Sequence, residues 1–141
     1  MSPRVFLSSS AEETVFAGEL LGRTLKKNDV AALSGVLGAG KTAFTRGIAR
    51  ALGIDEQVTS PTYTIISEYE GPEARLFHID AYRLSGEDDF IEAGGLEALE
   101  GGVAVIEWSE RIKALLPKHT KFITIKILAG GQREIHYENC C

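Results

Sequence analysis

Cysteine is almost absent from this chain of 141 residues, and its two cysteines, Cys140 and Cys141, are adjacent at the very end. Neighbouring cysteines at a chain end suit neither a disulfide framework nor a four-ligand zinc site, so we expect a reduced, frayed tail. The three histidines, His78, His119 and His136, are scattered without the spacing of metal ligands, which favours structural roles for all three. The sequence therefore argues against a protein built on disulfides or on zinc.

Long apolar runs and an excess of basic residues are missing as well. No stretch approaches 18 consecutive apolar residues, and the first residues lack the apolar run of a signal peptide, so we expect a cytoplasmic protein without a membrane segment. The chain carries 15 Lys and Arg against 20 Asp and Glu, which argues against a stand-alone binder of nucleic-acid backbone. Arg83 is the only basic residue between Asp80 and Glu110, and we expect that segment to present an acidic face to a basic partner.

The length is that of one typical domain, and we find neither an internal repeat nor a low-complexity linker, so we expect a single domain over residues 1–141. Leu, Ile, Val and Phe form about 28% of the chain, well above the level of roughly 20% below which disorder is typical. Fifteen glycines stand against four prolines, and we expect the excess in turns and in loops that let backbone approach a ligand.

Strand-like and helix-like segments alternate along the chain. Wholly apolar runs at residues 30–33 and 103–106 are typical of strands buried on both faces. The spacing of Ser10 and Glu13 matches a capping box and predicts a helix from there to about Lys27. The other predicted elements are a short strand at 4–7, a helix over 41–52 ended by Gly53, a helical region over 87–99 broken by two glycines, and two hairpins, 62–69 with 74–79 and 122–128 with 134–137.

Residues 35–42 read Gly-Val-Leu-Gly-Ala-Gly-Lys-Thr, which matches the phosphate-binding loop G-x-x-x-x-G-K-[ST] between a predicted strand and a predicted helix. Its glycines let consecutive backbone N–H groups point at phosphate oxygens, and the helix offers its positive end to the same charge. Lys41 adds a cation at the β and γ phosphates. The Thr42 hydroxyl suits Mg²⁺, which stays partly hydrated and needs only one or two further protein oxygens.

This motif and the predicted elements indicate an α/β fold of the three-layer P-loop NTPase type. We expect a mostly parallel central sheet with antiparallel additions from the two hairpins, and the nucleotide at the carboxyl ends of the central strands.

Two carboxylates that follow strands compete for the metal side of such a site. Asp80 follows residues 75–79, and Glu107 follows residues 103–106. Because the second run is more fully apolar, we expect it beside the loop strand in the centre of the sheet. We therefore predict that Glu107 lies on the Mg²⁺ side and that Asp80 orients either a water molecule or a group that contacts a metal ligand. Both are our candidate catalytic residues.

The Asn/Thr-Lys-x-Asp segment typical of guanine recognition is missing, which favours ATP. From the residues alone three functions stay open: an ATPase, a small-molecule kinase and a nucleotide-sensing scaffold without turnover. Kinases of this class bring several arginines over the phosphates in a lid. After the loop helix this chain has only Arg75, Arg83, Arg111 and Arg133, and none of them is paired in a lid-like segment.

Four motifs, in order, resemble the bacterial TsaE (YjeE) family, the small P-loop ATPases of tRNA threonylcarbamoyladenosine biosynthesis. They lie at residues 35–47, Ser60–Thr64, His78–Leu84 and Ile106–Trp108. The resemblance implies Mg²⁺-dependent ATP hydrolysis, weak in isolation and stimulated by partners, that serves modification of adenosine 37 in tRNA. The implied partners are the TsaD and TsaB subunits of the threonylcarbamoyl-transferase complex, with tRNA contacted only through that complex.

The same resemblance implies roles for individual residues. Lys41 and Thr42 would bind phosphate and Mg²⁺, Glu107 would be a metal ligand, and Asp80 would lie near the γ-phosphate. Thr59–Thr62 resembles a switch-like segment of the family. The residues implied to contact the nucleotide are Gly38, Ala39, Gly40, Lys41, Thr42, Ala43, Trp108 and Arg133.

The chain departs from the family pattern at two loop positions. Val36 stands where an aspartate is common, which removes a carboxylate from the loop. Ala43 stands where a threonine is common, which removes only a possible side-chain contact to phosphate.

Overall fold

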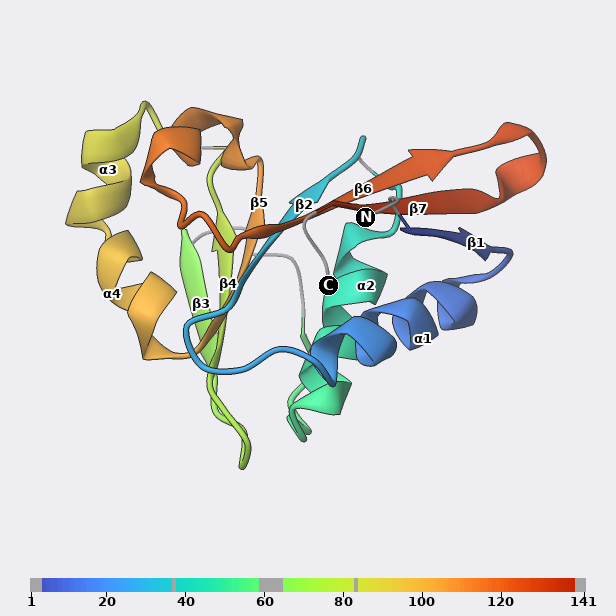
Figure 1. Cartoon of the computed structure of the whole chain (residues 1–141), viewed down its shortest axis with the longest axis horizontal. Coiled ribbons are helices and arrows are strands. Elements are labelled where there is room, and N and C mark those ends of the chain that lie inside the picture. The colour runs from blue at the N-terminus through green and yellow to red at the C-terminus, as the bar shows by residue number, and fades with distance from the viewer. Residues whose placement is uncertain (1–3, 37, 59–64, 83, 139–141) are drawn as a thin grey trace.

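The computed structural model describes residues 4–36, 38–58, 65–82 and 84–138, and it contains a seven-stranded sheet between helices (Figure 1). The strands are β1 (Arg4–Ser8), β2 (Val30–Ser34), β3 (Ile66–Tyr69), β4 (Leu76–Asp80), β5 (Val103–Glu107), β6 (Lys121–Ile127) and β7 (Arg133–Glu138). The helices are α1 (Ala11–Gly22), α2 (Lys41–Ala51), α3 (Glu87–Glu92) and α4 (Gly95–Gly101), with short 3-10 helices η1 (Ser109–Leu115) and η2 (Ala129–Gly131). No helix in these ranges is long and apolar enough to cross a membrane.

The centre of the sheet is parallel and its margins are antiparallel. The strand order is β1-β7-β6-β2-β5-β4-β3, with parallel pairing from β6 through β2 and β5 to β4. Antiparallel pairing adds β3 at one edge, and β7 followed by β1 at the other. The predicted fold class is confirmed, and so is the expectation that the apolar strand ending at residue 106 lies directly beside the loop strand.

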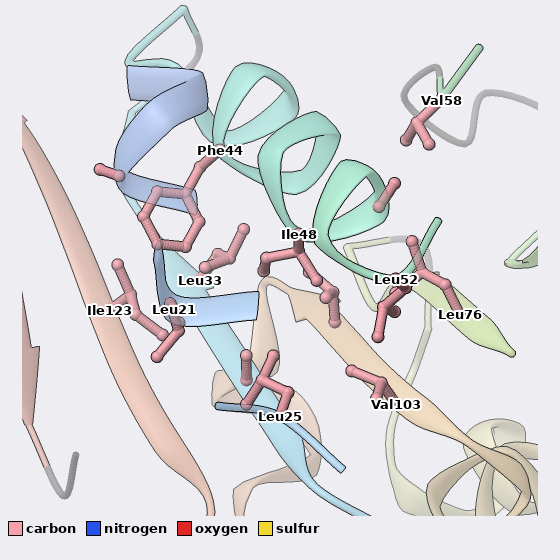
Figure 2. Close-up of a cluster of buried hydrophobic side chains, with 14 of the residues drawn as sticks. Leu21, Leu25, Leu33, Phe44, Ile48, Leu52, Val58, Leu76, Val103 and Ile123 are labelled. Atoms are coloured by element: carbon pink, nitrogen blue, oxygen red, sulfur yellow. The ribbon is translucent and has the colours of Figure 1, made fainter. Parts of the chain in front are cut away.

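Both faces of the central strands are buried, which explains their unbroken apolar runs. Alternate residues such as Ala31 and Leu33 of β2 join a core under α1 and α2, whereas Val30 joins a second core under α3, α4 and η1. Figure 2 shows the first of these cores, where Phe44 and Ile48 of α2 lie over the sheet. The sheet and its two helical layers therefore form the expected three-layer arrangement.

Helices α1 and α2 approach each other backbone to backbone, because the seam between them is made of glycine. A Cβ atom on Gly47 of α2 would lie 1.9 Å from the carbonyl oxygen of Val15, and one on Gly18 of α1 would lie 2.0 Å from that of Phe44. Any side chain at these positions would force the helices apart. This contact seats α2, whose first residues carry the phosphate-loop lysine and threonine.

The structure contains the predicted helices and strands, but several of them begin or end at other residues than predicted. Ser10 caps α1 as expected, its Oγ accepting a hydrogen bond from the amide of Glu13 at 3.1 Å, while the Glu13 carboxylate accepts from the amide of Ser9 rather than that of Ser10.

The prediction that this helix continues to Lys27 is wrong, because it ends at Gly22. The Thr24 hydroxyl donates to the carbonyl of Leu21 at 2.7 Å, and Asp29 Oδ2 accepts from the amide of Lys26, so a turn replaces the last helical turn. The predicted strand residues 62–64 and the two cysteines lie outside the described ranges.

Candidate active site

Three parallel strands end at the same edge of the sheet and bring the candidate residues together. In the register, Leu33 of β2 stands beside Glu107 of β5, which in turn stands beside Asp80 of β4. The glycine-rich loop leaves β2 at this edge and leads into α2. A cavity of about 610 Å³ results, lined by Gly38, Gly40, Lys41, Thr42, Asp80, Tyr82, Glu107 and Trp108.

The loop backbone has the conformation that exposes N–H groups to an anion. Gly38 and Gly40 have φ angles of 82° and 112°, in the left-handed region that favours glycine. Gly40 is the N-cap of α2 and has no side chain to accept a hydrogen bond from the first helical turn. The first-turn amides of α2 are therefore left for a ligand, which is the arrangement of an anion site at a helix N-terminus.

Lys41 lies at the base of the cavity and is only 7% exposed. Its Nζ lies 3.7 Å from Glu107 Oε1 and 4.5 Å from the centre of the Trp108 ring, within range of a cation–π interaction. The Trp108 ring also packs against Tyr82, with the ring centres 5.0 Å apart. The lysine ammonium thus lies between a carboxylate and an aromatic wall.

Glu107 is buried and makes its shortest contact with a histidine, His78, whose Nε2 lies 2.6 Å from Glu107 Oε2. Burial by itself favours the neutral acid and acts to raise the pKa of Glu107. The hydrogen bond from His78 and the positive charge of Lys41 act in the opposite direction and hold the pKa of Glu107 below its ordinary value. Glu107 is consequently an ionised carboxylate in a low-dielectric site at neutral pH.

Asp80 differs from Glu107 in its surroundings. It is half-buried at the edge of the cavity, and its Oδ1 accepts a hydrogen bond from the backbone amide of Tyr82 at 3.0 Å. The two carboxylates therefore occupy distinct positions, with Glu107 beside the loop lysine and Asp80 nearer to solvent.

A second, smaller recess of about 200 Å³ lies against the same loop. It is lined by Ser10, Ala11, Thr14, Gly38, Gly40, Ala43, Gly131 and Arg133. Arg133 donates from Nε to the carbonyl of Ala39 at 3.0 Å and from Nη2 to that of Gly38 at 3.3 Å. Arg133 thus binds the loop backbone through two hydrogen bonds and also forms one wall of the recess. Gly38 and Gly40 border both spaces, so the cavity and the recess adjoin at the loop.

Comparison with known proteins decides the family. The family model described as "Threonylcarbamoyl adenosine biosynthesis protein TsaE" matches residues 8–135, which is most of the chain. This chain belongs to the TsaE family. The resemblance noted in its motifs is confirmed.

Individual TsaE relatives match over most of their length. The protein named tRNA threonylcarbamoyladenosine biosynthesis protein TsaE from Treponema pallidum is 45% identical over 130 residues, covering 92% of this chain and 96% of the relative. The Bacillus subtilis protein of the same name is 42% identical over 127 residues, covering 89% and 79%. The crystal structure of YdiB from Bacillus subtilis superposes with a TM-score of 0.77 at 36% identity, covering 96% of this chain and 84% of that one.

Most of the residues predicted for this TsaE protein line the cavity, and three do not. Ala43 and Arg133 line the recess instead. Ala39 lines neither space, since its side chain is buried and its amide donates to the carbonyl of Val36. Arg83 and the switch-like segment Thr59–Thr62 lie outside the described residues.

Two site residues were missed by sequence reasoning. Tyr82 lines the cavity and packs on Trp108. His78, interpreted as structural, contacts the candidate metal ligand. A signal for His78 was present, because residues two apart on a strand share a face and His78 precedes Asp80 by two. Within the described residues no three or more His, Cys, Asp or Glu side chains form a metal-binding group.

Proposed function

We propose that this TsaE protein is a cytoplasmic Mg²⁺-dependent ATPase of tRNA N6-threonylcarbamoyladenosine modification at adenosine 37. In this proposal it acts with the TsaD and TsaB subunits of the threonylcarbamoyl-transferase complex and meets tRNA only through them. The names of its relatives support the pathway, and the site supports the activity. The observation that carries the activity is a single cavity lined by the loop lysine, the loop threonine and two strand-end carboxylates.

The cavity is suited to the phosphates of ATP, and the recess is suited to its ribose and base. Phosphate oxygens would accept hydrogen bonds from the first-turn amides of α2, and Lys41 would pair with the β and γ phosphates. The ribose and base would extend past Gly38 and Gly40 into the recess, where Ala43 and Arg133 form walls. The small side chain of Ala43 leaves room at this point.

The donor set fits Mg²⁺, because a hydroxyl and carboxylates are hard oxygen ligands and the ion retains several waters. Thr42 and Glu107 would hold it. Of the two carboxylate oxygens of Glu107, Oε2 contacts His78, so Oε1 would bind the ion. When bound, the ion would supply positive charge that offsets the negative charge of the phosphates. Asp80, at the solvent edge, would accept a hydrogen bond from the attacking water and orient it.

An arginine beside the transferred phosphate speeds phosphoryl transfer. No arginine is among the described residues that line it. An arginine finger contributes about 10³ to 10⁵ in rate where it is present. We therefore expect slow hydrolysis by the isolated protein and faster hydrolysis when a partner subunit completes the site.

Calorimetric titration of ATP into Lys41→Ala tests the assignment. Removing one partner of a desolvated charge pair costs roughly 2 to 5 kcal/mol, so ATP affinity should fall by at least about 30-fold. Lys27→Ala, which removes an exposed lysine distant from the loop in sequence, is the control and should bind as the wild type does. Unchanged affinity in Lys41→Ala would overturn the ATP site.

A second assay separates hydrolysis from group transfer. The protein is incubated with ATP, Mg²⁺, TsaD, TsaB and tRNA, and free phosphate is measured against phosphorylated products. Free phosphate that rises with the partner subunits supports the proposal. A phosphorylated metabolite formed by the chain alone would instead indicate a P-loop kinase.

A further inference from the structure

His78 is the most deeply buried titratable side chain near the cavity, yet it does not line it. It lies in the middle of β4, is 0% exposed, and shares its face of the strand with Leu76 and Asp80. Among the described residues, its ring forms a hydrogen bond of 2.6 Å from Nε2 to Glu107 Oε2. The ring therefore reaches the site through Glu107.

We propose that His78 is a positioning residue that holds the Glu107 carboxylate with Oε1 directed at the metal side of the site. This inference rests on the proposed function, because it assigns to His78 the orientation of the glutamate that would hold Mg²⁺. Hydrogen-bonded partners behind a metal ligand orient it in this way, and their loss typically lowers metal affinity about 10- to 100-fold.

The direction of the hydrogen bond sets the state of the ring. An ionised carboxylate only accepts hydrogen bonds, so His78 Nε2 must carry the proton and donate it. Nδ1 is buried and has no hydrogen-bond partner among the described residues. The contact with Glu107 therefore depends on the Nε2 proton and not on Nδ1.

Lys41 by itself does not hold Glu107 in place. Its Nζ lies 3.7 Å from Oε1, beyond hydrogen-bond distance, whereas the His78 contact is short. Without His78, the carboxylate would be free to turn and close on the Lys41 ammonium. Such an ion pair would draw the lysine away from the phosphates and would take Oε1 away from the metal.

Core packing alone does not account for a histidine at this position. The neighbouring buried positions of β4 are apolar, and Nδ1 of His78 has no hydrogen-bond partner in the part of the chain that the structure describes. Burying an unpaired polar atom costs stability, so an aliphatic residue would serve a purely structural role at least as well. The short contact to Glu107 is what an aliphatic residue cannot supply.

The test compares His78→Leu, which removes the donor, with His78→Gln, whose side-chain amide can donate from a position near Nε2. His136→Leu is the matched control, because His136 also bonds a glutamate, Glu134, but on the β7 hairpin strand outside the cavity lining. For each variant, calorimetry with a non-hydrolysable ATP analogue gives the Mg²⁺ concentration needed for half-maximal binding, and urea unfolding gives stability.

We expect His78→Leu to raise the required Mg²⁺ about 10- to 100-fold, His78→Gln to recover most of that loss, and His136→Leu to match the wild type. A folded His78→Leu protein with wild-type Mg²⁺ dependence would overturn the proposal. So would a Gln variant as impaired as the Leu variant while equally stable, because a general packing defect would then explain both.

A ligand-free measurement separates this inference from the proposed function. Long-range ¹H–¹⁵N NMR spectra of the wild-type protein should show a proton on Nε2 of His78, and Glu107→Gln should shift that Nε2–H resonance. If the ring carried its proton on Nδ1 instead, or if Glu107→Gln left the ring resonances unchanged, the proposed contact would be refuted even if ATP binds. A wild-type protein that fails to bind ATP but shows both NMR features would refute the proposed function and leave the contact standing.

Discussion

The glycine seam between α1 and α2 leads to the sharpest stability prediction. In Gly47→Ala the new Cβ would lie 1.9 Å from the Val15 carbonyl oxygen and 2.6 Å from the Glu19 amide nitrogen. Ordinary contact begins near 3.4 Å, so the first distance falls short by about 1.5 Å. Both neighbours are backbone atoms of α1, and no side-chain rotation relieves the overlap. The helices must separate.

The expected cost follows from two opposing effects. Overpacking of a well-packed core costs typically 1 to 3 kcal/mol and occasionally more, and here the shift also loosens the apolar contacts of Ala17 and Leu21 beneath α1. Alanine is the better helix former by about 1 kcal/mol, which offsets part of the loss. Because the overlap is severe, the overpacking cost should lie at the upper end of this range, and we expect a net destabilisation of about 2 kcal/mol. That is a sizeable share of the roughly 5 to 15 kcal/mol that stabilises a typical domain.

Urea unfolding followed by circular dichroism measures this change. The control is Gly86→Ala, because a Cβ on Gly86 has no heavy atom within 4 Å and its φ of 171° is ordinary extended backbone. Gly86→Ala should lie within about 0.5 kcal/mol of the wild type. If Gly47→Ala were as stable as that control, the helices would not be in backbone contact and the seam described here would be wrong.

Three further predictions concern the site. Glu107→Gln should raise the Mg²⁺ needed for ATP binding, whereas Asp80→Asn should spare binding and slow hydrolysis; a Mg²⁺ titration of both variants that gave the reverse pattern would exchange their roles. Because the pKa of Glu107 is lowered on folding, its ionised form contributes stability that is complete above the ordinary value of 4.5 and is lost as the pH falls through the folded value. Urea unfolding from pH 7 to pH 3 should therefore show the wild type losing more stability than Glu107→Gln, and parallel pH profiles would contradict this. Finally, stimulation of ATP hydrolysis by TsaD and TsaB should weaken at high salt and in Glu97→Lys, because α3 and α4 carry exposed carboxylates that a basic partner surface would contact. Full-rate hydrolysis by the isolated chain would argue against a site that a partner completes.

Local patterns in the sequence were sufficient for the parts of the protein that depend on near neighbours. The loop motif at 35–42 is set by residue types at fixed spacing, and its Gly-Lys-Thr end opens α2 as predicted. The runs at 30–33 and 103–106 indicated strands buried on both faces, which placed them together in the sheet centre. Ser10 was sufficient to place the start of α1, because a cap acts within one turn.

Tertiary structure decided whatever depends on residues far apart in the chain. The end of α1 at Gly22 depends on a turn that the repeating apolar positions do not reveal, since Leu25 is buried beyond the helix as well. The placement of β1 against β7 pairs the two ends of the described chain, and no local pattern specifies that partner.

The site itself shows the same division. Its residue types were readable, but the contact of His78 with Glu107 and the position of Trp108 over Lys41 were not. Strand order and register bring these side chains together across 29 residues of chain in the first case and 67 in the second. Such pairings are selected by the packing of the whole core, whereas a motif or a cap is selected by sterics and hydrogen bonds within a few residues.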